Sequence, residues 1–434
     1  MNAFRTYQSL AGKLNYALFL ALLIALPLPR MILQPIAVAW IISWVLECRF
    51  LNKERWHWNK QALPGILLVL LTVWEAISLL WAPDTQAGLR IIERHWPFII
   101  LVLIPIFGVN EHFRTEKMLP TLFAACVASV PLYLFVSYWV WNADAVIWFD
   151  HSALRPFEFP SIHGITSLMK LRSFYCIILM LSILSSPLLY RIYCRIYPKW
   201  EVLLTLGIAD LVMVSGMLMS GSRSGLLTLV IAIAFLMFVM YRHKLKWWMQ
   251  LLIIVVGLGV TVPTIIANPR FSTFLAPDIH NLDLSEASGL TEPRFYIWTA
   301  VVEHWQDYGS FGLGAGQHIE FMLERYREAG NDLFLNLEYG PHNQYFGFWM
   351  CLGPLAALLL LAAFILIPRV YRGAGRYTAH AFAFVFAFSM LSDDLLERMD
   401  SILIFLVWMV LLYVIESTGD KPIAAAPSLQ SDSE

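Results

Sequence analysis

The chain has 434 residues, of which 59% are hydrophobic and 14% are charged, and its formal net charge is −1 at pH 7. A soluble protein carries about 25% charged residues, so this composition excludes a protein built around one water-solvated core. The near-zero net charge gives no general attraction to nucleic acid, so any anion site has to be local. The five cysteines lie in or beside apolar stretches, which predicts neither a disulfide framework nor a cysteine-rich metal site.

Apolar windows recur along the chain at about the 20 residues that a helix needs to cross roughly 30 Å of hydrocarbon. The first window ends in Pro27-Leu28-Pro29-Arg30 without a small-residue cleavage pattern, which predicts an uncleaved first helix. We therefore predict an all-α integral membrane protein of about twelve transmembrane helices, near 14–29, 31–47, 63–82, 95–108, 118–141, 165–186, 200–220, 225–241, 249–267, 342–368, 378–392 and 401–416.

The loop charges predict the orientation. An even number of crossings places both termini on one side, and the Lys- and Arg-rich loops 49–60, 191–199, 242–246 and 369–376 lie on that side. The positive-inside rule makes that side cytoplasmic. The predicted organisation is then nine helices, a long outer loop, three further helices and a solvated cytoplasmic tail, over residues 1–267, 268–340, 341–416 and 417–434.

The long outer loop is predicted to contain two amphipathic helices. In the first, helical spacing places five apolar side chains on one stripe, namely Trp298, Val301, Val302, Trp305 and Tyr308. In the second, the stripe consists of Ile319, Met322, Leu323 and Tyr326. The glycine-rich segment 312–316 between them predicts a flexible turn, so that the two helices cover the outer mouth of the bundle.

Residues 220–225, with the sequence SGSRSG, form a polar turn between two apolar windows on the outer face. Its glycines allow a close backbone approach, Ser222 and Ser224 offer hydroxyl groups, and the next helix begins here with free N–H groups. Arg223 lies at a helix start, where the helix dipole disfavours a cation by about 0.3 to 1 kcal/mol. This pattern predicts an anion site, although Arg223 extending towards lipid headgroups is the alternative.

Arg294 repeats the pattern, because it follows Thr291-Glu292-Pro293 at a second predicted helix start. Two guanidinium groups at helix starts would suit the oxygens of a diphosphate. The alternative is a salt bridge from Arg294 to Glu292 or Glu303.

His342 follows Gly340-Pro341 at the predicted start of the tenth membrane helix. The positive end of a helix dipole favours the neutral imidazole, which a proton acceptor requires. A structural role near a cap formed by Asn343 or Gln344 is the alternative.

Further charged residues flank these three positions. Asp393 belongs to an acidic outer turn. In one interpretation a carboxylate of this turn orients His342 or Arg294, and the alternative is an ordinary exposed loop. Lys170 and Arg172 begin an apolar window near the outer face, where charge is costly unless it meets an anion or lines a cavity. No HExxH motif, metal-spaced Cys/His set or paired outer carboxylate motif is evident, so neither a metal nor another cofactor is expected.

Together, the SGSRSG segment, PRFYIW followed by GLGAG in 293–316, and HNQYFGFWMCLGP from His342 resemble the O-antigen ligase family, the WaaL-type enzymes that share a membrane domain with O-antigen polymerases. The resemblance implies transfer of a polysaccharide from undecaprenyl diphosphate to a lipid A core sugar, at the periplasmic face of the bacterial inner membrane. It implies that Arg223 and Arg294 hold the diphosphate and that His342 accepts the proton of the attacking hydroxyl, in a metal-independent, inverting reaction. Ser222, Ser224, Lys170, Arg172 and Asp393 are the expected substrate-binding neighbours.

Two other functions remain open. An O-antigen polymerase uses the same donor with a second lipid-linked repeat as acceptor, but often carries two large arginine-bearing outer loops. A transporter or flippase of a lipid-linked anionic solute would carry paired broken helices and charges near the membrane midplane. In this sequence the charged candidate residues are predicted near the outer surface of the membrane and not near its midplane.

Overall fold

The computed structural model describes residues 2–51, 56–142, 172–220, 222–241, 246–249, 251–252, 255, 259 and 294–418, and within these ranges the regular structure is helical. The α-helices are α1 (Asn2–Ala25), α2 (Arg30–Leu46), α3 (Leu63–Ser78), α4 (Thr85–His95), α5 (Phe98–Phe107), α6 (Thr115–Asn142), α8 (Arg172–Tyr193), α9 (Lys199–Ser220), α10 (Arg223–Tyr241), α13 (Arg294–Glu303), α14 (His318–Glu328), α15 (Asp332–Asn336), α16 (Gln344–Leu352), α17 (Pro354–Val370), α18 (Arg376–Ser389) and α19 (Met399–Thr418). Short 3₁₀ helices include η8 (Trp305–Tyr308) and η9 (Leu395–Glu397).

The chain is a multi-pass membrane protein. Seven helices among the described residues are long and apolar enough to cross a bilayer, at Thr6–Ala25, Met31–Leu51, Lys60–Ser78, Thr115–Val136, Ser173–Tyr193, Lys199–Ser220 and Met399–Thr418. They correspond to seven of the predicted windows, and an eighth, at 225–241, matches the shorter apolar helix α10. Most of the window predicted at 249–267 lies outside the described residues.

Three predicted windows differ from the structure. The windows near 95–108 and 378–392 contain the short helices α5, of 10 residues, and α18, of 14 residues. The window near 342–368 is two helices, because Gly353 has φ of 75° and Pro354 starts a new first turn. A Cβ at Gly353 would overlap the carbonyl of Ser310, so the break lets the preceding loop approach α16 and α17 closely.

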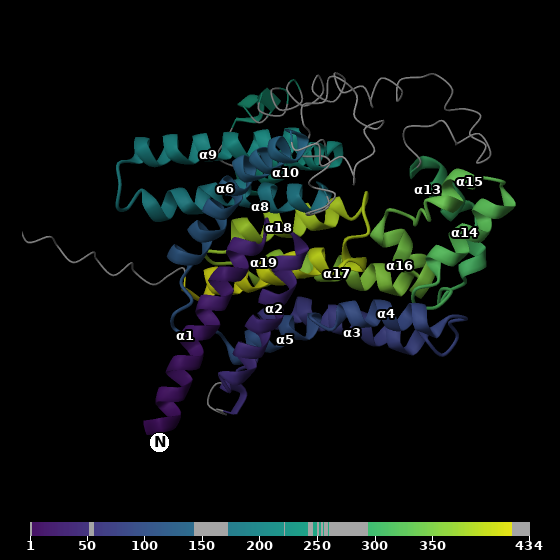
Figure 1. The fold of residues 1–434 in the computed structure, drawn as a ribbon, viewed down its shortest axis with the longest axis horizontal. Coiled ribbons are helices and arrows are strands. Elements are labelled where there is room, and N and C mark those ends of the chain that lie inside the picture. The colour runs from purple at the N-terminus through teal and green to yellow at the C-terminus, as the bar shows by residue number, and fades with distance from the viewer. Residues whose placement is uncertain are drawn as a thin grey trace, which may run out of the picture.

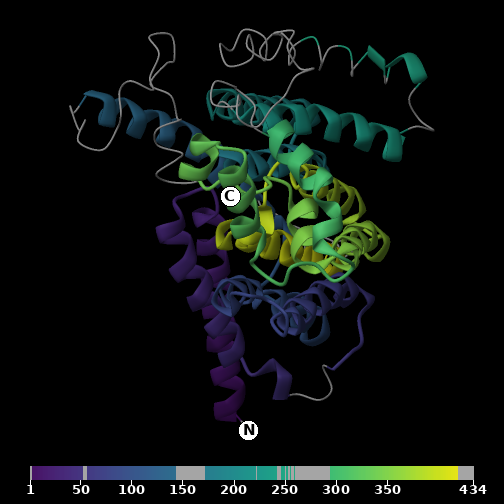
Figure 2. The same ribbon diagram turned by 90° about the vertical axis from the view of Figure 1, so that its right-hand side faces the viewer.

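Helix α19 forms the centre of the bundle and lies near the middle of both views (Figures 1 and 2). It is apolar on all sides, as a helix surrounded by other helices should be, and 78% of its membrane window is buried. In α9 the corresponding fraction is only 28%, and its exposed side chains include Leu203, Leu204 and Leu211. The outward surface of α9 therefore suits contact with lipid.

The bundle has two distinct ends. One end contains the turn that precedes α19 and the starts of α8, α10 and α16. The opposite end contains the segments that follow α8 and α17. At that other end, the Glu416 carboxylate accepts hydrogen bonds from the backbone N–H groups of Arg372 and Gly373, at 3.1 and 2.7 Å. The 20 residues of α19 separate the two ends by about 30 Å.

The described part of the long loop contains the two predicted amphipathic helices, α13 and α14, and a short third one, α15. They lie together at one end of the bundle, at the right of Figure 1, around a hydrophobic cluster of their own that includes Ile297, Val301, Met322, Tyr326 and Phe334.

The stripe predicted for α14 is confirmed at Met322, Leu323 and Tyr326, which are buried. The stripe predicted for α13 is partly wrong, because Val302 and Trp305 are 50% and 52% exposed. The α-helix ends at Glu303 and continues as the tighter 3₁₀ turn η8, which changes the spacing of the buried face.

The glycine-rich segment 312–316 is a tightly packed turn and not the expected flexible hinge. Gly312 has φ of 77°, and a Cβ there would overlap the backbone of Cys351. The N–H groups of Leu313 and Gly314 donate to the carbonyls of Met350 and Cys351, both at 2.8 Å. The segment therefore fixes the loop helices against α16.

The segment between the predicted windows 63–82 and 95–108 is also mostly helical, as α4. Asp84 accepts hydrogen bonds from the backbone N–H groups of Gln86 and Ala87, at 2.9 and 3.2 Å, and so caps the helix. This helix brings Arg94 and His95 to the candidate site.

Candidate functional site

The predicted site segments meet at one end of the bundle, where α8, α10 and α16 begin beside the turn that leads into α19. The start of α10 packs on the first turns of α8: Ser222 Oγ accepts a hydrogen bond from Gly225 N at 3.2 Å, and Ser220 Oγ lies 3.0 Å from Cys176 Sγ. A Cβ on Gly225 would lie 2.8 Å from the Cβ of Cys176. Ser222 is thus a buried helix cap, and Gly225 serves helix packing and not ligand approach.

The start of α8 connects in turn to the acidic turn. Ser173 Oγ donates a 2.5 Å hydrogen bond to Asp393 Oδ2. This contact places the backbone of Arg172, the first residue of α8, next to Asp393. Lys170 and the side chains of Arg172 and Arg223 lie outside the described part of the structure, whereas Ser224 is half-buried in the first turn of α10.

His342 lies just before α16 and not inside it, which corrects the predicted start of that helix. Its φ is 45°, and the cap is formed by Asn343, whose side chain accepts from Tyr345 N and Phe346 N at 3.0 and 3.2 Å. His342 Nδ1 is 3.9 Å from Asp394 Oδ2, and the His342 side chain is 30% exposed. The imidazole therefore has one nitrogen facing a carboxyl group and remains partly accessible.

The pKa of His342 is lowered from its ordinary value, as the sequence predicted, but the causes are different. Burial is the largest cause, and the charges of Arg294 and Arg398 add to it, while the carboxylates of Asp393 and Glu397 oppose it. The neutral imidazole is therefore favoured by burial and nearby guanidinium groups.

Arg294 begins α13 and is half-buried. Its helix is attached to the segment before His342, because Trp298 Nε1 donates to Pro341 O at 2.9 Å. The influence of Arg294 on the pKa of His342 follows from this attachment. The structure thus brings Arg294, His342 and Asp393 together, with the backbone start of α10 nearby.

The acidic turn is packed into the protein, which excludes the simple exposed loop that the sequence left open. Leu395 and Leu396 are fully buried and Asp394 is 8% exposed. Burial raises the pKa of Asp394 well above its ordinary value, and the charge of Glu397 adds to the rise. This environment favours the protonated acid at Asp394.

The pKa of Glu397 shifts in the opposite direction to that of Asp394, because Glu397 has His318 as a cationic partner. Burial alone would raise its pKa, but the charge of His318, 2.9 Å away, holds the pKa of Glu397 below its ordinary value. Burial would lower the pKa of His318, yet Glu397 holds it well above the ordinary value. These two residues form a largely buried ion pair, and the Glu397 charge acts on His342.

The sequence interpretation missed His318 and Glu75, and each had a visible signal. His318 is on the buried stripe of α14, four residues before Met322, where an ionisable side chain is out of place. Glu75 is the one charged residue of the apolar window 63–82, and it pairs with His95 at 2.7 Å. The partners of both could not be identified without the fold.

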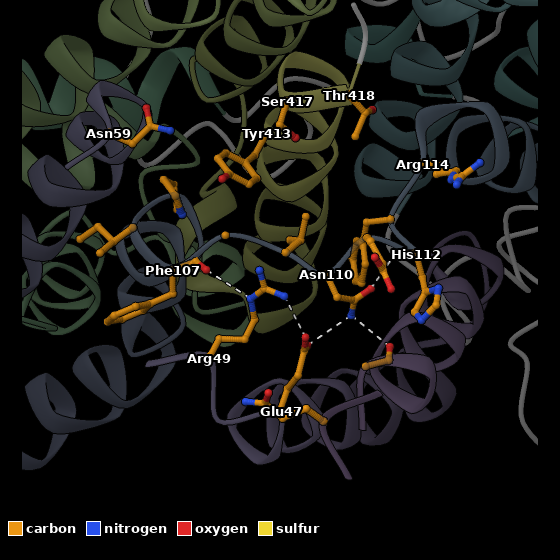
Figure 3. A pocket seen from close by; sticks show the side chains of 18 of the residues that line it. Glu47, Arg49, Asn59, Phe107, Asn110, His112, Arg114, Tyr413, Ser417 and Thr418 are labelled. Atoms are coloured by element: carbon orange, nitrogen blue, oxygen red, sulfur yellow. Dashed lines mark hydrogen bonds and ion pairs between the residues drawn. The ribbon is translucent and has the colours of Figure 1, made fainter. Parts of the chain in front are cut away.

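A cavity of about 1060 Å³ lies at the opposite end of the bundle, beside the end of α19 (Figure 3). Its buried polar groups bind one another: Arg49 Nη1 is 2.9 Å from Glu47 Oε1, and Asn110 Nδ2 donates to Glu47 Oε2 at 3.2 Å. Arg49 Nε also donates to Phe107 O at 3.2 Å. This network joins α2 to the segment after α5, and we place the candidate site at the other end.

Comparison with known families gives one match and one negative result. Residues 208–362 match the family model described as O-antigen ligase, and no curated protein sequence matches the chain. The matched range includes the turn at 220–225, the α13 and glycine-rich segments, and His342. The chain therefore carries an O-antigen ligase domain at residues 208–362, of the family of membrane enzymes that ligate or polymerise lipid-linked O-antigen.

Proposed function

We propose that the protein is an O-antigen ligase that transfers a polysaccharide from undecaprenyl diphosphate to a sugar hydroxyl of the lipid A core. The observation that carries the proposal is that a partly accessible His342, whose pKa is lowered, lies within electrostatic range of Arg294 and Asp393. Helix α8 contacts both Asp393 and the segment from which α10 starts with Arg223. A proton acceptor beside guanidinium groups is what a direct displacement of a diphosphate requires.

In this reaction His342 is the general base. Nδ1 is on the side of Asp394, 3.9 Å from Oδ2, and we propose that Nε2, the other ring nitrogen, accepts the proton of the acceptor hydroxyl. The hydroxyl oxygen forms a bond to the anomeric carbon as the bond from that carbon to the diphosphate oxygen breaks. The electron pair leaves with the diphosphate, and a single displacement inverts the anomeric carbon.

The two arginines have the electrostatic role. Arg223 and Arg294 would hold the diphosphate and stabilise the charge that grows on it as it departs, so that the reaction needs no metal ion. Ser222, Ser224, Lys170, Arg172 and Asp393 are the proposed neighbours of this group.

The proposed orientation has the site in the periplasm and both termini in the cytoplasm. The basic segments after α8 and α17 lie at the end of the bundle opposite to His342, which supports this orientation under the positive-inside rule.

Purified protein tests the proposal directly. We expect the native chain to transfer a lipid-linked glycan to lipid A core in the presence of a chelator, and Arg223→Ala to abolish the transfer. Extension of a second lipid-linked repeat instead would identify a polymerase. Movement of the donor across vesicles without a new glycosidic bond would identify a transporter.

A further inference from the structure

The buried ion pair between His318 and Glu397 joins two distant parts of the chain. His318 begins α14 in the long loop, and Glu397 lies in the turn between α18 and α19. His318 Nε2 is 2.9 Å from Glu397 Oε1, and the two side chains are 3% and 18% exposed. On its other side, His318 Nδ1 lies 3.1 Å from Cys351 Sγ of α16.

Helix α4 holds the backbone of the same turn. Arg94 Nη1 donates to Glu397 O at 2.7 Å, and His95 Nε2 is 2.7 Å from Leu396 O. His95 Nδ1 is in turn 2.7 Å from Glu75 Oε2 of α3, with both side chains almost fully buried.

Helix α16 holds the turn from the side of His342. Gln344 Oε1 accepts a hydrogen bond from Leu396 N at 2.7 Å, and Gln344 N donates to Met390 O at 2.9 Å. The turn that carries Asp393 and Asp394 is therefore fixed by residues from α4, α14 and α16.

We propose that His318 and Glu397 are positioning residues, which hold the carboxylate turn against His342 and so link the loop helices to the proton acceptor. The inference rests on the proposed function of His342 as general base. A buried ion pair is weak support for stability alone, since apolar residues of similar volume are often as stable. In this protein the His318–Glu397 pair includes a residue of the turn that carries Asp393 and Asp394, which face His342. The pair therefore influences both the position of these carboxyl groups and the charge around His342.

The charged environment of His342 determines what the pair should do to the reaction. The groups that face it are Arg294 from α13, Asp393, Asp394, Glu397 and Arg398 from the turn, and the ring of Tyr339 at 5.5 Å. Glu397 favours the imidazolium, so its removal should lower the pKa of His342 further. Burial, which is the larger cause, keeps Asp394 protonated in that variant. Removal of His318 takes away the charge that holds the pKa of Glu397 down, so burial should favour the neutral acid at Glu397. The pKa of His342 should then fall in this variant too, because the Glu397 charge no longer favours the imidazolium.

The test compares Glu397→Gln and His318→Gln with the native protein, using purified, folded protein, lipid-linked glycan donor and lipid A core acceptor. We expect kcat to fall by roughly 10- to 100-fold in both, as for a displaced reacting group, with the donor KM close to native. The acidic limb of the kcat profile should move to lower pH in both variants. Hydrogen exchange of the amides in 393–398 should be faster in both variants.

The matched control is Glu320→Gln, which removes an exposed ion pair with Arg327 on the same helix α14, at 3.1 Å. It should leave kcat, the pH profile and the exchange of 393–398 unchanged. The inference is overturned if the two test variants keep native exchange, or if their kcat per folded protein or acidic limb matches the native chain. A native chain that transfers nothing would instead refute the proposed function, and the exchange measurement would still decide whether the pair holds the turn.

Discussion

His342 adopts a backbone conformation that few residues with a Cβ adopt, with φ of 45°. Such strain persists only where the surroundings impose it, and it is enriched at functional sites. Here the surroundings are the Trp298 hydrogen bond to Pro341 on one side and the Asn343 cap of α16 on the other. The imidazole is thus held at the start of α16 without being part of the helix.

The lowered pKa of His342 gives a prediction for the pH dependence of transfer. Only the neutral imidazole accepts a proton, so activity is present above this pKa and is lost as the pH falls through it. We expect the acidic limb of kcat in the native protein to lie below the ordinary histidine value of about 6.5. His342→Ala should lower kcat by about 100-fold or more, measured as transfer rate at saturating donor. A limb above 6.5 would contradict the buried environment.

Asp394 and Glu397 should affect stability in opposite ways. The pKa of Asp394 is raised in the folded protein, so its contribution to stability is lost as the pH rises, and Asp394→Asn should melt at or above the native temperature near neutral pH. The pKa of Glu397 is lowered, so its contribution is present near neutral pH and is lost in acid. Glu397→Gln leaves His318 buried without its partner and should cost about 3–5 kcal/mol. Melting in detergent at two pH values measures both, and equal destabilisation by the two variants would contradict this assignment.

At the scale of residues, the sequence suggested candidate site residues but not the residues that they contact. Arg294 and His342 were identifiable because each follows a proline at a helix start, and the structure brings them within electrostatic range. The pairing of His318 with Glu397 was not predictable, because it depends on how the long loop folds back onto the turn before α19.

At the scale of elements, close backbone contact decides where the helices break. The turn at 312–316 and the break at Gly353 fit together, because the loop lies against the end of α16 with glycines on both sides of the contact. The LGP sequence signals this break, but a window of hydropathy averages over it. The amphipathic α4 was missed because it is too short and too polar to register as a membrane window.

Two glycines give a matched test of this packing. Gly309 and Gly312 both have positive φ, at 62° and 77°, but a Cβ on Gly309 would meet open space whereas one on Gly312 would overlap Cys351. Gly309→Ala should cost about 1–3 kcal/mol from backbone strain. Gly312→Ala should cost clearly more and should also reduce kcat, because it displaces the loop from α16. Equal melting temperatures for the two variants would show that the contact is not tight.

At the scale of the whole molecule, the candidate site and the basic segments after α8 and α17 occupy opposite ends of the bundle. The membrane character and most of the long helices were predictable from hydropathy. The interior position of α19 was not, because an apolar window looks the same whether it faces lipid or other helices.

The orientation can be measured in cells with single cysteines on a background without the native ones. Glu320→Cys, at the site end, should react with a membrane-impermeant thiol reagent added from the periplasmic side. Ile196→Cys, exposed at the other end, should react only after the inner membrane is permeabilised. The reverse pattern would place the site in the cytoplasm.

Binding of an undecaprenyl diphosphate donor to purified protein distinguishes the residues that hold the diphosphate from the residue that accepts the proton. We expect Arg223→Ala and Arg294→Ala to weaken binding by about tenfold or more, in line with the loss of a charge-assisted contact of roughly 1.5–3 kcal/mol. We expect His342→Ala to bind the donor as the native protein does and yet to transfer nothing. Native donor affinity in both arginine variants, or an equal loss of binding in His342→Ala, would show that the arginines do not hold the diphosphate separately from the base.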